Sequence, residues 1–253
     1  MVTKSEIRLV RDLADKRTRD AEGLFVAEGE KLIGEMLRSD LRIRTVYALE
    51  GVFAAERRRA PEALFREVSP AEMARLSHLK TAGRALAVVE IPHRPLNRQT
   101  LGEELVLALD EVQNPGNLGT IIRLADWYGI GDIICSPATA DCFNPKVVQA
   151  TMGAILRVRV HYTPLAPFLR EAAGRGLPVY GTFLEGDDIY RTELTPAGVL
   201  VMGNEGRGVT PAVAAASTRK LFSPPSPAGR RTTESLNVAM ATGIVCSEFR
   251  RRM

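Results

Sequence analysis

The stretch Val199-Leu200-Val201-Met202-Gly203-Asn204-Glu205-Gly206-Arg207-Gly208-Val209 opens the part of this sequence, residues 199–238, that decides the fold. Its first four residues form an apolar run typical of a buried strand, and a glycine-rich turn follows at once. The part closes on Ser235-Leu236-Asn237-Val238, a polar loop in front of an apolar, helix-like segment. Open α/β sheets build nucleotide pockets from such loops at the ends of their strands.

The residues around this part alternate between strand and helix patterns. Asn117 is interpreted as the cap of a helix closed by Gly129. Several short strands with helical crossovers predict a mostly parallel sheet covered on both faces. The expected strands are 105–109, 132–135, 157–162, 179–183, 199–202 and 220–223, and the expected helices are 118–128, 145–156, 165–174, 211–217 and a last one after 237.

The first hundred residues also alternate, which predicts a separate small three-layer α/β domain. Ser69, Pro70 and Glu72 have the spacing of a helix start, and Ser5 is available to cap an earlier helix. A proline-containing linker, Pro92 to Gln99, places the boundary near residue 95, which gives domains 1–95 and 96–253. The expected strands are 24–27, 45–49, 65–68 and 86–91, and the expected helices are 5–14, 28–38, 51–59 and one beginning at 70.

The composition is ordinary for a globular protein, with 45% hydrophobic and 25% charged residues among 253. No apolar run is long enough to predict a membrane span, and the first residues lack the apolar core of a signal peptide. Cys135, Cys142 and Cys246 show no metal-ligand spacing, and their odd number argues against a disulfide framework. We therefore expect buried thiols, no metal and a cytoplasmic location.

The net charge of +4 is small but unevenly placed. Residues 1–100 hold 19 Lys and Arg against 15 Asp and Glu, whereas the remainder holds 15 of each. A basic module joined to a neutral one fits a domain that contacts phosphate beside a domain that does chemistry, although four charges can also mean nothing. The early positive residues form either a solvated face or the edge of an RNA-binding surface; they are Lys4, Arg8, Arg11, Lys16, Arg17 and Arg19.

The glycine turn is not a dinucleotide fingerprint. Gly203, Gly206 and Gly208 are spaced G-x-x-G-x-G, which differs from the G-x-G-x-x-G pattern, and no P-loop lysine follows. A glycine turn alone is usually only a turn. Glu205 inside the turn and the companion loop at 235–237 favour a binding site, because glycines leave the backbone open to a ligand.

A second constellation lies in residues 107–123, where Asn117 precedes Arg123 on a helix whose other residues are mainly apolar. Such an arginine normally points to water or pairs with an acid. In the functional interpretation Arg123 faces the site, where a guanidinium suits a phosphate.

Together these stretches resemble the SpoU/TrmH family of RNA ribose 2′-O-methyltransferases, within the SPOUT class. The resemblance covers about residues 105–250, with the three motifs in the family's order. Asp110 to Gly129 is similar to the first motif, Leu200 to Val209 to the second, and Ser235 to Ala239 to the third. The first 90 residues, chiefly Phe25 to Leu32, resemble the family's substrate-binding domain, whose fold is shared with kink-turn-binding ribosomal proteins.

The resemblance implies an α/β enzyme that methylates ribose 2′-hydroxyls with S-adenosyl-L-methionine. It further implies a C-terminal trefoil knot that holds the cofactor, and a homodimer whose site uses both subunits. Periodicity alone would argue against a knot, because threaded chains are rare. Ribosomal RNA is the expected substrate, since the resemblance includes a separate N-terminal domain. The alternatives are a tRNA methyltransferase, a non-catalytic RNA-binding protein with this fold, and an α/β enzyme for another nucleotide.

The resemblance also assigns roles to individual residues. Arg123 would be either the proton acceptor or a clamp on the target phosphate, since a guanidinium is rarely deprotonated. Many relatives carry Arg where this chain has Gln149, and the loop 223–234 is longer and richer in proline than usual. The expected catalytic residues are Arg123, Asn117, Glu205, Ser235 and Asn237. The expected cofactor-binding residues are Thr182, Gly203, Glu205, Gly206, Pro224 and Leu236.

Overall fold

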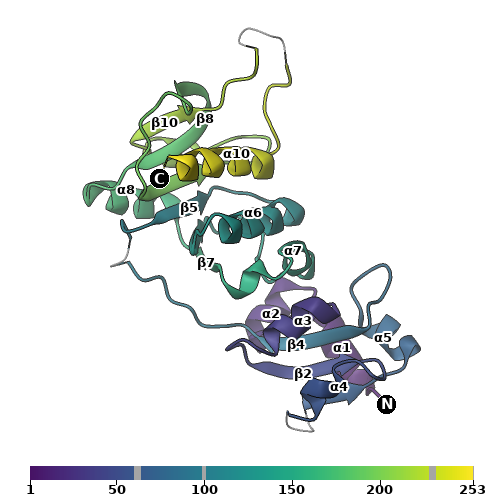
Figure 1. Ribbon diagram of the computed structural model, residues 1–253. Coiled ribbons are helices and arrows are strands. Elements are labelled where there is room, and N and C mark those ends of the chain that lie inside the picture. Colours follow the sequence, from purple (N-terminus) through teal and green to yellow (C-terminus); the bar gives the residue numbers. More distant parts are fainter. Residues whose placement is uncertain (60–63, 99–100, 228–231, 253) are drawn as a thin grey trace. The chain divides into compact units, whose positions relative to one another are not determined.

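The computed structural model describes residues 1–59, 64–98, 101–227 and 232–252 (Figure 1). The chain forms two compact units: residues Met1–Arg94 with Asp141–Leu156, and residues Pro95–Ala140 with Arg157–Met253. The sequence places one boundary near residue 95, and the chain passes between the units at Arg94 and Pro95. The segment 141–156, expected in the second domain, instead clusters with the first unit. Gln99 of the expected linker and residues 228–231 of the expected loop lie outside the described residues.

The first unit contains a four-stranded sheet of order β1-β4-β2-β3. Strand β4 pairs antiparallel with β1 and β2, and β3 adds in parallel to β2. Apolar side chains alternate between the two faces of the sheet, which is the period-two pattern of a sheet covered on both sides. The strands are β1 (Leu24–Glu28), β2 (Ile43–Ala48), β3 (Phe65–Glu67) and β4 (Ala85–Glu90).

Helices cover both faces of this sheet, as a three-layer domain requires. One face packs with Ile33 and Met36 of α3 and with Val148 of α7, and the other with Val10 of α1 and Met73 of α5. The helices of this unit are α1 (Lys4–Asp12), α2 (Lys16–Glu22), α3 (Glu30–Met36), α4 (Ala54–Arg57), α5 (Pro70–Leu76), α7 (Pro145–Ala150) and the 3-10 turn η2 (Ala154–Leu156).

Buried contacts bind segment 141–156 into this unit. Arg19 is 1% exposed and bonds to Asp141 Oδ2 from Nε (3.0 Å) and Nη2 (2.5 Å), while Nη1 bonds to the carbonyls of Leu13 and Ala14. The ring of Phe143 packs 4.8 Å from that of Phe25. The expectation of Arg19 on a solvated, RNA-facing surface is therefore wrong, because its charge is paired inside the unit.

Two local expectations for this half change in detail. The first helix is capped by Thr3 and not by Ser5, because Thr3 and Glu6 form a reciprocal capping box. The helix expected over 145–156 breaks after Ala150, since Met152 and Gly153 take positive φ angles of 51° and 95°. The start at Ser69, Pro70 and Glu72 is confirmed as a capping box.

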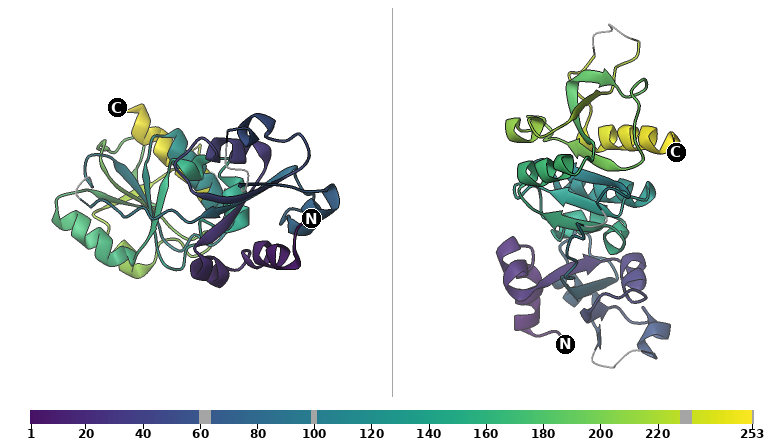
Figure 2. Two further views of the ribbon diagram at one scale, coloured as in Figure 1. Left: turned by 90° about the horizontal axis from the view of Figure 1, so that it is seen from below. Right: turned by 90° about the vertical axis from the view of Figure 1, so that its left-hand side faces the viewer.

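The second unit is built on a six-stranded sheet of order β10-β8-β9-β5-β6-β7, in which every recorded pair is parallel. Figure 2 gives two further views, in which helix α10 is the yellow C-terminal element. The strands are β5 (Leu105–Leu109), β6 (Asp132–Cys135), β7 (Arg159–Tyr162), β8 (Val179–Asp188), β9 (Gly198–Met202) and β10 (Arg219–Phe222). The helices are α6 (Pro115–Trp127), α8 (Leu165–Gly174), α9 (Pro211–Ala214) and α10 (Val238–Arg251).

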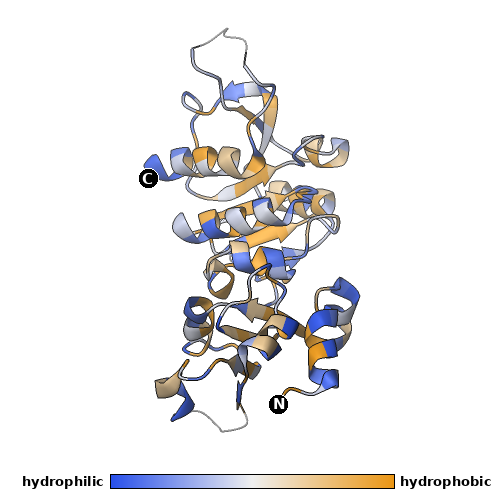
Figure 3. Ribbon diagram, turned by 90° about the vertical axis from the view of Figure 1, so that its right-hand side faces the viewer, coloured by the Kyte–Doolittle hydropathy of each residue, from blue (hydrophilic) through white to orange (hydrophobic). Residues whose placement is uncertain are grey.

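The two central strands of this sheet are continuous apolar runs. All five residues of β5 and all five of β9 are buried, as expected for a parallel sheet covered on both faces. In Figure 3 the strands of this unit are largely orange, for hydrophobic residues, whereas the helices mix orange, white and blue. Their register sets Leu109 beside Met202, so the loops that leave both strands start side by side. In the described residues, no helix has the length and apolarity needed to cross a membrane.

Candidate active site

The loops after β5 and β9 meet at the carboxyl edge of the second sheet, where open α/β sheets bind ligands. Asp110 begins one loop and is 2% exposed; its Oδ2 accepts a hydrogen bond from the Thr210 amide at 2.7 Å. Asn204 in the other loop donates from Nδ2 to the Glu111 carbonyl at 2.7 Å. Hydrogen bonds therefore tie the two loops together at both ends of the glycine turn.

Asn117 connects this pair of loops to the last helix. Its expected role as helix cap is wrong, because Asn114 caps α6 by accepting from the amides of Gly116 (2.8 Å) and Asn117 (3.1 Å). Asn117 then lies in the first turn, where its Nδ2 donates to Glu205 Oε1 at 2.9 Å. Its Oδ1 accepts from Asn237 Nδ2 at 3.1 Å. Three expected catalytic residues thus form one network from three separate parts of the sequence.

Glu205 is the acceptor on which the network converges. Besides Asn117, its carboxylate accepts from the backbone amides of Asn114 (3.3 Å) and Gln113 (3.5 Å). Partial burial acts to raise the pKa of Glu205, but the hydrogen bonds from Asn117 and the backbone outweigh it, so the pKa is lowered. Glu205 is therefore a carboxylate at neutral pH, held by donors of the first loop.

Asn237 has two functions at the start of α10. Its Oδ1 caps the helix by accepting from the amides of Ala239 (3.0 Å) and Met240 (3.4 Å), while its Nδ2 reaches Asn117. At the far end, Arg250 donates to the carbonyls of Tyr128 (2.7 Å) and Gly129 (3.2 Å) after α6. Helices α6 and α10 therefore run parallel, with both N-termini at the network, where their dipoles favour the Glu205 charge.

The glycine turn closes on itself more tightly than the sequence indicates. A Cβ on Gly203 would lie 2.3 Å from the carbonyl carbon of Gly208, so no side chain fits there. The turn itself therefore requires glycine at this position, and the contact of the Gly203 backbone with the cofactor stays a prediction. Gly206 differs, since its Cβ would meet only Asn204 Oδ1 at 3.7 Å.

Sequence reasoning missed Asn204, Glu111 and Arg207. Asn204 Oδ1 accepts from the amides of Gly206 (2.9 Å) and Arg207 (3.0 Å), which fixes the turn from inside. Glu111 has a positive φ of 58° and pairs with Arg207 at 2.5 Å. A usable signal was present for Asn204, because asparagine in a glycine turn commonly bonds backbone two residues on.

Arg123 stands outside the network. It is exposed on α6 and makes no hydrogen bond or ion pair within the described part of the chain. Trp127 lies one turn further along the same face of α6 and is 83% exposed. Arg123 is therefore free of structural duties in the single chain.

The remaining expected residues are less closely grouped. Thr182 donates from Oγ1 to the Val201 carbonyl at 2.9 Å, which ties β8 to β9. Pro224 is partly buried after β10, Leu236 is 53% exposed, and Ser235 is exposed and without a hydrogen bond in the described chain. Residues 206–208 of the glycine turn are exposed as well. No group of three His, Cys, Asp or Glu residues suited to a metal occurs among the described residues.

Comparisons with known proteins agree on one family. The model of the SpoU rRNA Methylase family matches residues 104–247, and that of an MRM3-like substrate binding domain matches residues 4–87. The chain is 30% identical over 244 residues to the 23S rRNA (guanosine(2553)-2′-O)-methyltransferase RlmP of Bacillus subtilis, which covers 94% of this chain and 93% of that protein.

Solved structures give the same result. An AdoMet-bound rRNA methyltransferase from Sinorhizobium meliloti superposes with a TM-score of 0.87 at 32% identity, covering 100% of this chain and 97% of that one. A TrmH-family structure from Porphyromonas gingivalis has a TM-score of 0.88 at 39% identity, and the match covers 100% of both chains.

Proposed function

We propose that this chain, which belongs to the SpoU rRNA methylase family, transfers a methyl group from S-adenosyl-L-methionine to a ribose 2′-hydroxyl of ribosomal RNA. The main structural support is the hydrogen-bond network of Asn237, Asn117 and Glu205, which joins the three motif loops at the carboxyl edge of the sheet. The relatives support the substrate class, because RlmP is named for 2′-O-methylation of 23S rRNA and the S. meliloti structure is named for bound AdoMet.

The residues of the chain would divide the work as follows. When bound, S-adenosyl-L-methionine supplies a methyl group already activated as a sulfonium, so the protein needs mainly to align it with the ribose and to assist loss of a proton. Gly206 and Leu236 would contact the cofactor, with Thr182 and Pro224 on neighbouring strands. Asn117, Glu205 and Asn237 hold those loops in one arrangement, with Ser235 next to them on the side open to RNA.

Arg123 is the residue we assign to the target nucleotide. Its exposure and lack of a partner within the described chain leave its guanidinium available to the RNA. A guanidinium recognises a phosphate by two parallel hydrogen bonds, and it stays charged near neutral pH. We therefore favour a clamp on the target phosphate or ribose over a proton acceptor.

We also propose that two copies associate through α6 and α10, so that the site uses both subunits. Trp127 is 83% exposed at the C-terminal end of α6, while Leu236 (53%) and Met240 (64%) are exposed at the N-terminal end of α10. Exposed large apolar side chains on neighbouring helices are typical of interaction surfaces. Arg123 shares the face of α6 that carries Trp127, which would place it beside the second subunit. Trp127→Glu should halve the mass in sedimentation equilibrium, and an unchanged dimer would contradict this surface.

The remaining features of the proposal concern the fold, the location and the RNA. We propose a trefoil knot in the C-terminal part, supported by β9 lying between β8 and β5. We propose a cytoplasmic location, in keeping with Cys135, Cys142 and Cys246, which are buried and form no disulfide in the described chain. The first unit would bind the RNA substrate. The competing functions are methylation of tRNA and RNA binding without methyl transfer.

A thermal-shift comparison tests the cofactor directly. S-adenosyl-L-methionine should raise the melting temperature of the purified protein, because a ligand that binds only the folded state stabilises it. NAD and ATP should not. A shift with NAD or ATP alone would replace the proposal with another nucleotide-dependent activity.

A further inference from the structure

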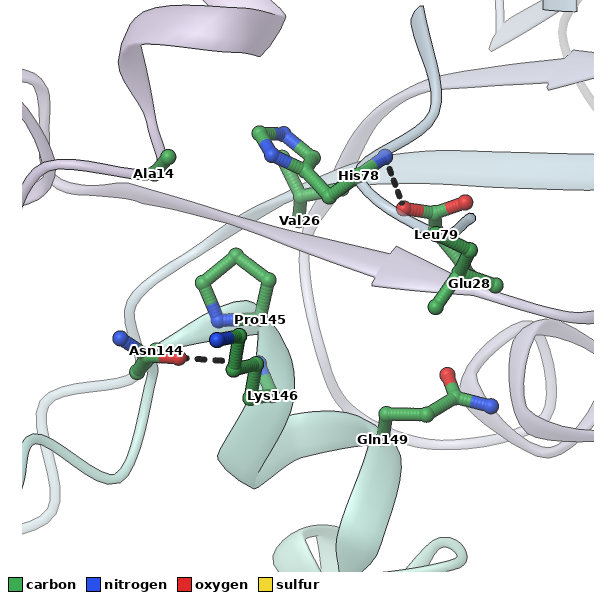
Figure 4. Close-up of a pocket in the computed structure, with 9 residues that line it drawn as sticks. All are labelled: Ala14, Val26, Glu28, His78, Leu79, Asn144, Pro145, Lys146 and Gln149. Atoms are coloured by element: carbon green, nitrogen blue, oxygen red, sulfur yellow. Dashed lines mark hydrogen bonds between the residues drawn. The ribbon is translucent and has the colours of Figure 1, made fainter. Parts of the chain in front are cut away.

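A cavity of about 210 Å³ lies within the first unit, and no residue that lines it takes part in the proposed methyl transfer. Figure 4 shows its two walls: residues from β1 and from the loop after α5 form the first, and residues at the start of α7 and within it form the second. Its volume is below the ~300–1,000 Å³ of sites for drug-sized ligands, so it suits one small ring system. The lining residues are Ala14, Val26, Glu28, His78, Leu79, Asn144, Pro145, Lys146 and Gln149.

The first wall is fixed by hydrogen bonds. Glu28 is 5% exposed, and its carboxylate accepts from Ser77 Oγ at 2.5 Å and from the His78 amide at 2.7 Å. The His78 ring lies with Nε2 2.8 Å from the Val10 carbonyl oxygen. A carbonyl only accepts, so Nε2 donates the proton of this bond, which fixes the plane of the ring. The wall thus presents an oriented aromatic ring.

The second wall offers unused polar groups. Asn144 Oδ1 accepts from the Lys146 amide at 2.9 Å and fixes the start of α7. Lys146 Nζ, the Gln149 side-chain amide and Asn144 Nδ2 have no hydrogen-bond or ion-pair partner in the described residues. Lys146 and Gln149 are three residues apart on one helix, so they share a face. Both are exposed.

These groups suit a nucleobase better than a phosphate. The buried Glu28 carboxylate would repel an anion inside the cavity, whereas a base is neutral and flat. Proteins read single-stranded RNA by stacking unpaired bases on rings, histidine included, and by bonding their edges with amides. An amide such as that of Gln149 both donates and accepts, and a lysine at the mouth can pair with the phosphate that the base carries.

We propose that this cavity binds one unstacked base of single-stranded RNA, packed between His78 and Pro145, with Gln149 bonding the edge of the base and Lys146 pairing with the adjoining phosphate. The inference rests on the proposed function only in taking RNA as the ligand. The first unit would then recognise the base at one position of the RNA, in addition to attracting RNA by its positive charge. Gln149 then serves the base and not a phosphate.

The test is fluorescence anisotropy of the full-length protein with labelled oligomers of A, C, U and a mixed G-containing sequence, and with a duplex of equal length. The wild-type protein should prefer single strands and one base. Gln149→Leu should weaken binding to the preferred oligomer about tenfold and flatten the preference, because base contacts carry the discrimination. Lys146→Met should reduce the salt dependence by about one phosphate contact. Neither side chain makes a bond within the described fold, so both variants should melt normally.

Lys80→Met is the matched control, since Lys80 is an exposed lysine of the same unit outside the cavity. It should weaken every oligomer alike and keep the base preference. An unchanged preference in Gln149→Leu, or equal binding of duplex and single strands by the wild type, would overturn the cavity's role. Methyl transfer to rRNA, measured on the same samples, separates that result from failure of the proposed function.

Discussion

At the scale of single residues, the side chains of the site fall into two groups: those that hydrogen-bond within the fold and those that do not. Asn117, Glu205 and Asn237 bond to one another and to the neighbouring backbone. Arg123 is bonded to nothing in the described chain. Removal of a residue of the first group should therefore affect the loops themselves, whereas removal of Arg123 should affect only the reaction.

Arg123→Ala should leave the melting temperature and cofactor affinity near wild type, because the side chain is exposed and without partners within the described residues. It should slow single-turnover methyl transfer by about 10²-fold or more, the scale of a lost charge stabiliser or base. Arg123→Lys should restore little if the planar fork aligns the phosphate. A wild-type rate for Arg123→Ala would remove Arg123 from the site.

Glu205→Gln should destabilise the protein in a pH-dependent way. The pKa of Glu205 is lowered in the fold, so its charged form contributes stability above the unfolded pKa of about 4.3, and this contribution is lost as pH falls through the folded value. Urea unfolding should show the variant to be weaker at pH 7 and close to wild type in acid. Glu185→Gln, at an exposed position, is the control. A deficit that is the same at every pH would contradict the account.

At the scale of elements, hydrophobic patterns in the sequence predict strands and helices well, while caps and turns escape them. The buried runs of β5 and β9 are long and uniform, so both strands are correctly predicted. The cap of α6 is not, because Asn114 and Asn117 are both suitable by type and only the fold decides which accepts the first amides. The placement of segment 141–156 in the second domain is wrong for the same reason. Its partners Arg19 and Phe25 are more than a hundred residues away in the sequence.

Gly203→Ala should damage the glycine turn, because its Cβ would lie 2.3 Å from backbone of Gly208. Overpacking of this kind costs about 1–3 kcal/mol, and the displaced turn should lose cofactor affinity in a calorimetric titration. Gly206→Ala is the control for stability, since its Cβ would meet its nearest neighbour at 3.7 Å. Equal melting temperatures for wild type and Gly203→Ala would show that the turn is not as tight as described.

At the scale of the whole molecule, the first unit depends on a segment from the second half of the sequence. The proline-containing linker places the domain boundary near residue 95. Sequence patterns do not show which unit residues 141–156 pack against. The buried pair of Arg19 and Asp141 links that segment to the first unit. A fragment that ends near residue 90 would expose Arg19 and Phe25, so RNA binding by the first unit is best tested in the full chain.

Asp141→Ala should destabilise the protein by about 3 kcal/mol or more, because it leaves the Arg19 charge buried with only carbonyl partners. Asp20→Ala breaks an exposed pair with Lys16 at 2.7 Å and should cost less than about 1 kcal/mol. Chemical denaturation of both variants gives the comparison. Equal losses would indicate that Asp141 does not anchor the segment.

The central claim is that this chain methylates a ribose 2′-hydroxyl of ribosomal RNA. The most direct measurement incubates the purified protein with methyl-labelled S-adenosyl-L-methionine and total RNA from a strain that lacks the gene, followed by nucleoside analysis of the separated RNAs. We expect label in a 2′-O-methylated nucleoside of the ribosomal RNA, in a linkage that resists alkali because the 2′-hydroxyl is blocked. Label on a base, label confined to tRNA, or cofactor binding with no transfer to any RNA would contradict this claim.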